Sequence, residues 1–529
     1  MSRRNLVFGV ALLVLLLTVL HLQQTSVLVP NHIDGIDRIP DYESVETELT
    51  EQKETSSDDP EVAVQPPIVE ELVKEDRTPT ACDNVDFGWL ASDRVYWDGW
   101  VSKAMFMRQD GNFTTKHVFI SERDSVCVVV LLGPAPAKSA IRPEEHLAPA
   151  DSIVMTAVGK SMKQIIELMQ HEKQTNVYYA SVTFPYEGTY YLDTRTEYRS
   201  YFWEEPVLHQ YRPNRFTSQN KLVVRSRSNA PKPTLPPCDF SNPAHNHGGW
   251  MKKTEYQRIF PLDFFGMFGV SQEDHAENNR LYVPGECRPQ YVSIGQASEC
   301  LKHKVVHVWA DGNVRRNLKA FSSGNRWCSD VESPCVCNDD DEDPEGVLYP
   351  WATDASVPLI INETWGADTS IYFNQVGSIN LENYKQVISE RAQDISKADI
   401  VILGFGNEDI RNRDVSPTQF ANTFLDLVSY LRTSVYPTQT MIIRTPQPFC
   451  CGTIYSTSWN AGRSAAFTQA VVDGVMKLNQ GDRKVLLWDV HQLGLPDHMC
   501  VLSGTAYTKR NVVNIENQLL WNLICGAVF

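Results

Sequence analysis

Three loops hold the polar residues whose types could do chemistry, namely Ala310–Gly312, Phe405–Asn407 and Val490–Cys500. They supply a carboxylate at Asp311, an amide at Asn407 and the histidines of the third loop. Each loop follows an apolar run typical of a buried strand. Carboxyl ends of parallel strands meet at one edge of a sheet, where the sites of α/β proteins gather. We therefore expect the three loops to form one candidate site.

A metal centre is the less favoured interpretation of the histidines. His245 and His247 have ligand-like spacing, but they lie in a loop rich in Asn and Pro, without further Asp, Glu or Cys partners nearby. A surface loop explains them better. We expect neither a metal nor a cofactor.

The elements that would position these loops alternate between strands and helices after Cys238. Such alternation requires crossover connections and predicts a parallel sheet flanked by helices. One helix has a clear start, because Ser416 is a suitable N-cap and Pro417 suits the first helical position; we expect this helix to end near Thr433. The expected strands are Val305–Trp309, Val357–Ile361, Ile400–Gly404, Met441–Thr445 and Val485–Asp489, and the other expected helices are Glu382–Lys397, Ala465–Leu478 and Val512–Ile524.

Residues 238–529 resemble the PC-esterase group of the SGNH hydrolase fold, which includes the neurexophilin and PC-esterase domain family and the trichome-birefringence-like polysaccharide O-acetyltransferases. The motifs that carry the resemblance stand in the family's order. They are Cys238-Asp239 with Gly249-Trp250, Cys300-Leu301 followed by Ala310-Asp311-Gly312 and Arg315, Gly404-Phe405-Gly406-Asn407, and Trp488-Asp489 followed by Asp497-His498. The resemblance implies an SGNH-like (flavodoxin-like) sheet and a catalytic site at Asp311, Gly312, Arg315, Asn407, Asp497 and His498.

The catalytic motif departs from that family pattern. Active members use a Ser nucleophile, a His base and an Asp that orients the His, but here Gly312 stands at the Ser position. Asp497 and His498 are adjacent instead of three residues apart, which leaves Asp489 with His491 as another pairing. We expect a noncatalytic relative, in which Asp311 caps a helix and Arg315 pairs with a carboxylate. Asn407 would be an oxyanion donor in an active relative, and a loop-stabilising role is the equal alternative here.

Two other functions stay open. An active glycan O-acetyltransferase or esterase would need a relocated nucleophile, for which Ser322, Ser323 and Ser503 are available. An adhesion-type ectodomain would place the function in the region before Cys238. The preferred hypothesis is a protein that binds glycan or assists a glycan-modifying enzyme.

The region before the linker has a different rhythm. We expect a β-sandwich over residues 82–228, then a Pro-rich linker over 229–237. The runs Val177–Phe184 and Thr189–Leu192 around a short Gly-containing loop predict a hairpin. Lys160–His171 is expected to be one inserted helix.

The N-terminus predicts a secretory-pathway protein. Residues 1–5 would form a cytosolic tail, 6–22 a signal-anchor helix, and 23–81 a disordered acidic stem. The rest would lie in the lumen of the Golgi or another secretory compartment, with the sequons Asn112 and Asn362 as glycosylation sites. Cleavage of the segment and secretion is the alternative. The net charge of −17 argues against nucleic acid as a partner.

The twelve cysteines fit disulfides in an oxidising compartment better than zinc sites, because no pair of C-x-x-C motifs exists. We expect Cys238 to pair with Cys287, and Cys500 to pair with Cys525, although spacing alone does not determine the connectivity.

Overall fold

The computed structural model of the chain describes residues 79–92, 101–133, 141–142, 145–205, 213–227, 235–239, 247–259, 279–288, 291–322, 359–360, 369–380, 383–450, 458–480, 485–502 and 505–525. Residues 1–78, with the predicted tail, anchor and nearly all of the stem, lie outside these ranges. So does most of the predicted linker. None of the described helices combines the length and apolar character needed to cross a membrane.

The predicted parallel sheet is confirmed. Its six strands have the order β14-β15-β13-β16-β17-β18, and all neighbours are parallel except the edge pair β14 and β15. Numbered along the chain, the parallel strands have the order 2-1-3-4-5, which is the flavodoxin-like arrangement. The strands are β13 (Val305–Ala310), β14 (Leu359–Ile360), β15 (Ser370–Gln375), β16 (Ile400–Gly404), β17 (Thr440–Arg444) and β18 (Leu486–Trp488).

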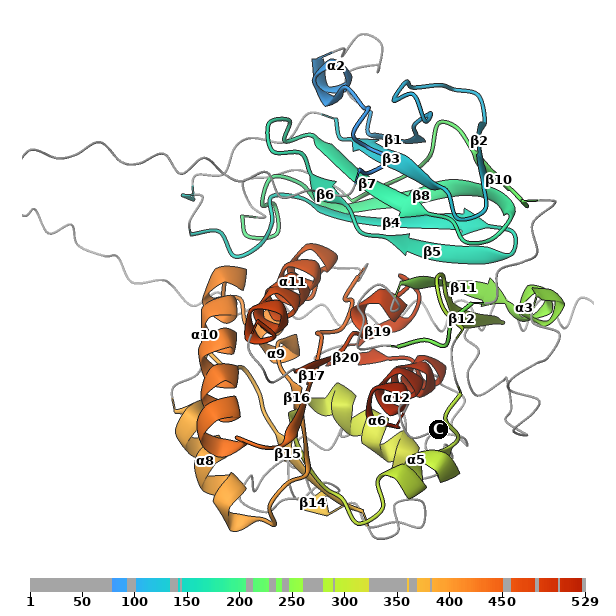
Figure 1. The fold of residues 1–529 in the computed structure, drawn as a ribbon. Helices are drawn as coiled ribbons and strands as arrows, with labels where there is room; N and C mark the ends of the chain where they lie inside the picture. The colour runs from blue at the N-terminus through green and yellow to red at the C-terminus, as the bar shows by residue number, and fades with distance from the viewer. Residues whose placement is uncertain are drawn as a thin grey trace, which may run out of the picture. The chain divides into compact units, whose positions relative to one another are not determined.

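Helices cover both faces of this sheet (Figure 1). Alternate residues of the strands enter two separate cores, as the pleat requires: Val308 packs with α5, α6 and α12, whereas Trp309 packs with α8, α10 and α11. Burial on both faces explains why the strands are continuous apolar runs. The helices are α5 (Ile294–Cys300), α6 (Gly312–Ser322), α8 (Tyr384–Asp394), α9 (Asn407–Arg411), α10 (Pro417–Tyr430), α11 (Ala461–Leu478) and α12 (Arg510–Cys525).

The helix predicted from Ser416 begins where expected. The Ser416 hydroxyl accepts from the Gln419 amide, and the Gln419 side chain accepts from the Ser416 amide, which completes a capping box ahead of Pro417. The α-helix ends at Tyr430 and continues as one π-helical turn, Leu431–Val435. Of the predicted strand Val357–Ile361, the structure describes Leu359 and Ile360, which form β14.

The region before this sheet contains two further sheets that share one hydrophobic core. The smaller has the order β1-β3-β7-β6, and the larger has the order β12-β11-β5-β4-β8-β10-β2, with β9 paired to β8. The far face of the smaller sheet packs near α2 (Phe87–Ser92). The strands are β1 (Lys103–Phe106), β2 (Val118–Ser121), β3 (Ser125–Leu131), β4 (Ser152–Gly159), β5 (Met162–Ile166), β6 (Met169–Gln170), β7 (Val177–Thr183), β8 (Gly188–Tyr198), β9 (Asn214–Thr217), β10 (Leu222–Arg225), β11 (Gly248–Lys252) and β12 (Arg280–Pro284).

Strands β11 and β12 follow the predicted linker in sequence, yet they extend the larger sheet. Trp250 and Met251 of β11 pair with Lys163 and Met162 of β5. After β11 the chain enters the short helix α3 (Lys253–Ile259).

Two local predictions for this region are wrong. Strands β7 and β8 do not form a hairpin, because β7 pairs with β3 in the smaller sheet and β8 pairs with β4 in the larger one. Their connection passes between the sheets, with Phe184 and Tyr186 buried in the shared core. Lys160–His171 is not a helix, because pairing with β4 and β11 makes strand β5 of its first part, and pairing with β7 makes β6 of a later part.

Three disulfides join described residues. Cys238–Cys287 is confirmed, and Cys82–Cys127 links the segment before α2 to β3. The predicted pair Cys500–Cys525 is wrong, because Cys525 at the end of α12 bonds to Cys300 at the end of α5. The two helices pack side by side on one face of the sheet, which brings these ends together.

Candidate functional site

The first candidate site lies at the carboxyl ends of β13 and β16, where the strand order reverses. Asp311 follows β13 and caps α6: its Oδ1 accepts from the amides of Asn313 at 2.9 Å and Val314 at 3.4 Å. Burial raises the pKa of Asp311, while Arg444 and a hydrogen bond from Asn407 oppose that rise. The carboxylate therefore has a helix-capping role in this structure.

Asn407 lies at the corresponding turn after β16 and meets Asp311 through its side chain. Its Oδ1 also accepts from the backbone amide of Gln447 at 2.8 Å, so the amide holds the loop after β17. The preceding Gly406 has a φ of +113°, a conformation that favours glycine. Asn407 is 5% exposed, so its polar atoms serve protein contacts.

Gly312 opens α6 next to the ring of Tyr507 from β20 (Thr505–Thr508), which pairs with β19 (Met499–Leu502). A Cβ atom at position 312 would lie 3.5 Å from Cε1 and 3.9 Å from the hydroxyl of Tyr507, which are ordinary contact distances. The tyrosine ring in turn lies 4.6 Å from the guanidinium of Arg316. The backbone could therefore accept a serine at this position. Glycine, however, has no side-chain oxygen or sulfur that could attack an acyl group.

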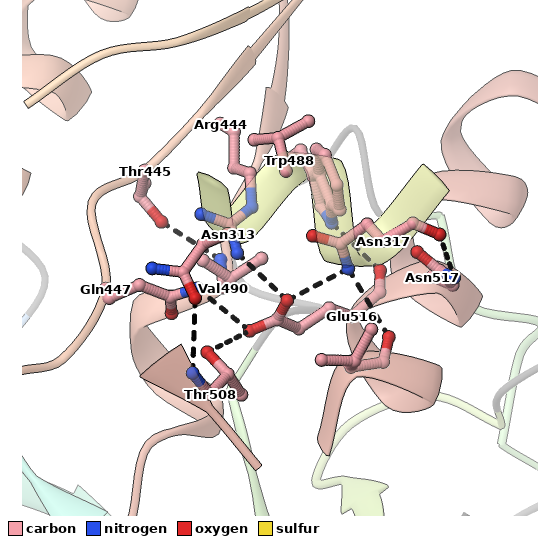
Figure 2. A network of polar contacts seen from close by, with 12 residues as sticks. Asn313, Asn317, Arg444, Thr445, Gln447, Trp488, Val490, Thr508, Glu516 and Asn517 are labelled. Atoms are coloured by element: carbon pink, nitrogen blue, oxygen red, sulfur yellow. Dashed lines mark hydrogen bonds and ion pairs between the residues drawn. The ribbon is translucent and has the colours of Figure 1, made fainter. Parts of the chain in front are cut away.

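A buried polar network lies beside this turn (Figure 2). Its centre is Glu516 of α12, whose Oε2 accepts from Arg444 at 2.9 Å and from Asn317 at 3.0 Å. Its Oε1 accepts from the Thr508 hydroxyl at 3.2 Å. The side chains of Arg444 and Glu516 are each 1% exposed, so the ion pair is fully removed from solvent. Arg315 is also buried, one turn into α6.

His498, the predicted base, contacts residues outside the turn at Asp311 and Gly312. His498 Nδ1 lies 3.0 Å from the carbonyl of Leu493, and its ring packs edge-on against Trp250 at 4.3 Å. Asp497 is half exposed, with its carboxylate 4.0 Å from Nε2 of His498. Burial lowers the pKa of His498 to about 4, so the ring is neutral near pH 7. The described contacts of His498 include neither Asp311 nor Gly312.

The serines considered as relocated nucleophiles find little support. The Ser322 hydroxyl is buried and donates to the carbonyl of Lys319 at 3.3 Å. Ser323 and Ser503 lie outside the described residues, as do Asn362 and His245. The other sequon residue, Asn112, is exposed in the turn after β1.

A second polar cluster, which the sequence did not predict, joins β5 to the last loop. The His491 ring lies with Nε2 at 3.2 Å from the Ser464 hydroxyl and Nδ1 at 3.7 Å from the Glu167 carboxylate. The Ser464 hydroxyl donates to the carbonyl of Gln447 and accepts from the amide of Phe449. Ser464 is fully buried, and its proton is directed to a carbonyl and not to the histidine. Ser464, His491 and Glu167 are therefore arranged in sequence, but the serine hydroxyl is not available as a nucleophile.

Asp489 explains the orientation of that histidine. Strand β18 ends at Trp488, and the Asp489 carboxylate accepts from the His491 amide at 3.2 Å and from the Thr445 hydroxyl at 3.2 Å. The strand pleat therefore does not continue to His491, which turns toward Glu167. Burial raises the pKa of Asp489, while the adjacent His491 lowers the pKa of Glu167.

The described residues were also considered as ligands for a metal ion. Within the described residues, no group of three or more His, Cys, Asp or Glu side chains could hold an ion. Cys450, beside the second cluster, is disulfide-bonded.

Comparison with known proteins gives structural likenesses only. Neither a family model nor a curated protein matches the chain. Two similar solved structures are a carbohydrate acetylesterase family member from Sinorhizobium meliloti and the inhibitor-bound aryl esterase of M. smegmatis. Each is 12% identical, with a TM-score of 0.28, and the match covers 42% of this chain and 99% of the other. Both are named as esterases, and likenesses at this level do not assign this chain to a family.

Proposed function

We propose that this chain is a noncatalytic SGNH-like protein of the PC-esterase type, with a β-sandwich before its α/β region. The observation that carries the proposal is Gly312 at the turn after β13, the position at which the resembling enzymes have their Ser nucleophile. Covalent acyl transfer needs an oxygen or sulfur nucleophile there. Glycine supplies neither.

The neighbouring groups support the same conclusion. Asp311 accepts hydrogen bonds that cap a helix, and Asn407 accepts one that holds a loop. The contacts of His498 lie with its own loop and Trp250. These are structural roles that do not require catalysis.

The proposed setting is the lumen of the Golgi or another secretory compartment, with a single anchor at residues 6–22. The exposed Asn112 sequon and the disulfides support an oxidising compartment. In that setting the protein would bind glycan or assist a glycan-modifying enzyme.

A fluorophosphonate probe tests the noncatalytic assignment. The purified full chain should show no specific labelling by mass spectrometry, because the proposal leaves no activated serine. Heat-denatured protein controls for nonspecific reaction. Labelling of one serine in the folded chain only, abolished when that serine is changed to alanine, would contradict the proposal.

An enzyme with a relocated nucleophile is the second candidate. One observation favours it: the Ser464 hydroxyl lies 3.2 Å from His491, and Glu167 lies on the other side of the ring. The burial of Ser464 opposes it. Loss of labelling in Ser464→Ala, with labelling retained in Ser322→Ala, would establish this candidate.

A further inference from the structure

Two adjoining cavities lie beside β5, away from Gly312. Their volumes are about 770 Å³ and 450 Å³, and both are lined by Ile165, Ile166, Glu167, His247 and Gln492. We call the two together the β5 cleft. Volumes of several hundred Å³ are typical of sites for small ligands.

Three residues that line the β5 cleft each have a buried polar atom without a hydrogen-bond partner: Oε1 of Gln164, Oε1 of Gln492 and the hydroxyl of Thr468. The hydrogen bonds of the two side-chain nitrogens determine the orientations of the Gln164 and Gln492 amides. The Gln492 nitrogen donates to Asp489 at 2.6 Å, and the Gln164 nitrogen donates to the carbonyl of Thr183 at 3.4 Å. Buried polar atoms are normally paired, so these two oxygens call for donors from outside the protein.

The charges around the cleft select against anions. Its walls carry the carboxylates of Glu167, Glu286 and Asp489 and one arginine, Arg123. A phosphate, carboxylate or sulfate would meet a mainly negative surface. Neutral hydroxyl groups, by contrast, can donate to the amide oxygens and carboxylates without a charge penalty.

The smaller cavity adds an apolar wall. It is also lined by Met155, Ile165, Phe449, Val472 and Leu487. Such a wall suits the C–H face of a sugar ring or the methyl group of an acetyl substituent, because apolar surface leaves water there. A ligand that carries both hydroxyl donors and C–H groups matches this mixed lining.

We infer that the β5 cleft binds a neutral saccharide. Its hydroxyl groups donate to Gln164, Gln492 and Glu167, and one of them pairs with the hydroxyl of Thr468. The inference rests on the proposed glycan-binding function and gives it a location distinct from the Gly312 turn. No acyl transfer is required at this site.

Binding of defined oligosaccharides tests this inference. The full chain is titrated with neutral tetrasaccharides of glucose, galactose, xylose, mannose and N-acetylglucosamine, and with tetragalacturonate and hexylammonium as anionic and cationic probes. At least one neutral tetrasaccharide should bind. Its Kd should rise about tenfold or more in the Gln164→Leu/Gln492→Leu variant, which removes two hydrogen bonds. Gln386→Leu, at an exposed position of α8, is the matched control and should leave the Kd unchanged.

Thr468→Val keeps the test decisive if the double variant does not fold, since it changes one buried hydroxyl to a methyl group. It should weaken the same saccharide several-fold. Saccharide binding that survives every cleft variant would overturn the location and leave the glycan-binding function standing. Absence of binding by every neutral tetrasaccharide would overturn both, and binding of only the anionic or only the cationic probe would overturn the neutral assignment.

Discussion

Removing Glu516 should destabilise the protein strongly, because this carboxylate compensates the buried charge of Arg444. Leucine at position 516 would leave that guanidinium 1% exposed without its ion-pair partner, and would also strand the donors of Asn317 and Thr508 (Figure 2). Breaking a buried ion pair by removing one partner typically costs about 3–5 kcal/mol. We expect a loss of that size in the free energy of unfolding for Glu516→Leu.

The double variant Arg444→Met/Glu516→Leu is the control. Replacing both charges with apolar groups avoids the uncompensated cation, so its loss should be smaller, about 1–3 kcal/mol from the polar groups left unpaired. Urea unfolding followed by tryptophan fluorescence measures both losses, since Trp488 is buried and donates to the Glu516 carbonyl at 2.9 Å. A loss below about 1 kcal/mol for Glu516→Leu, or a double variant as destabilised as the sum of its single variants, would refute this reasoning.

Three further predictions concern pH, covalent structure and compartment. His498 has its pKa lowered by burial to about 4, below its value of about 6.5 in an unfolded chain, so protonation favours unfolding; stability should fall from pH 6.5 to pH 4 by up to about 3 kcal/mol, and His498→Asn should flatten that dependence in urea titrations. Peptide mapping without reduction should recover Cys300 linked to Cys525, and replacing both with serine should cost about 2–5 kcal/mol; recovery of both as free thiols would exclude the bond. Asn112→Gln should increase the gel mobility of protein from secretory cells, and equal mobility before and after the change would rule out a glycan there.

Sequence patterns predicted the α/β region because each signal there is local. The capping box at Ser416 marks the helix start, and continuous apolar runs such as Ile400–Gly404 mark strands covered on both faces. The turn at Asp311–Gly312 was placed correctly after the first strand for the same reason.

The β-rich region was harder to predict from the sequence, because strand pairing between distant segments decides its secondary structure. Met162–Ile166 contains residues that tolerate a helix, and only its partners in β4 and β11 make it a strand. Likewise, the short connection between β7 and β8 is compatible with a hairpin, whereas the side chains of Phe184 and Tyr186 carry the chain across the core.

The contact between Glu167 and His491 could not be predicted from the sequence, because it joins two segments far apart in the chain. Glu167 directly follows β5 in the segment predicted to be a helix, and His491 lies in the loop after the last predicted strand. The hydrogen bonds of Asp489 and Thr445 to the His491 amide turn the chain there. The sequence offers Asp489 and His491 as an alternative pair, but no sequence feature connects either residue to β5.

The most direct test of the noncatalytic assignment is the intact mass of the full chain during reaction with excess p-nitrophenyl acetate. An acyl-enzyme would add one acetyl group to one serine within the first turnover, before steady-state release of product. Because Gly312 stands where the proposed relatives have their nucleophile, we predict no such species and no burst of p-nitrophenol. A stoichiometric acetyl adduct on a single serine, formed and then hydrolysed at the rate of product release, would contradict the account.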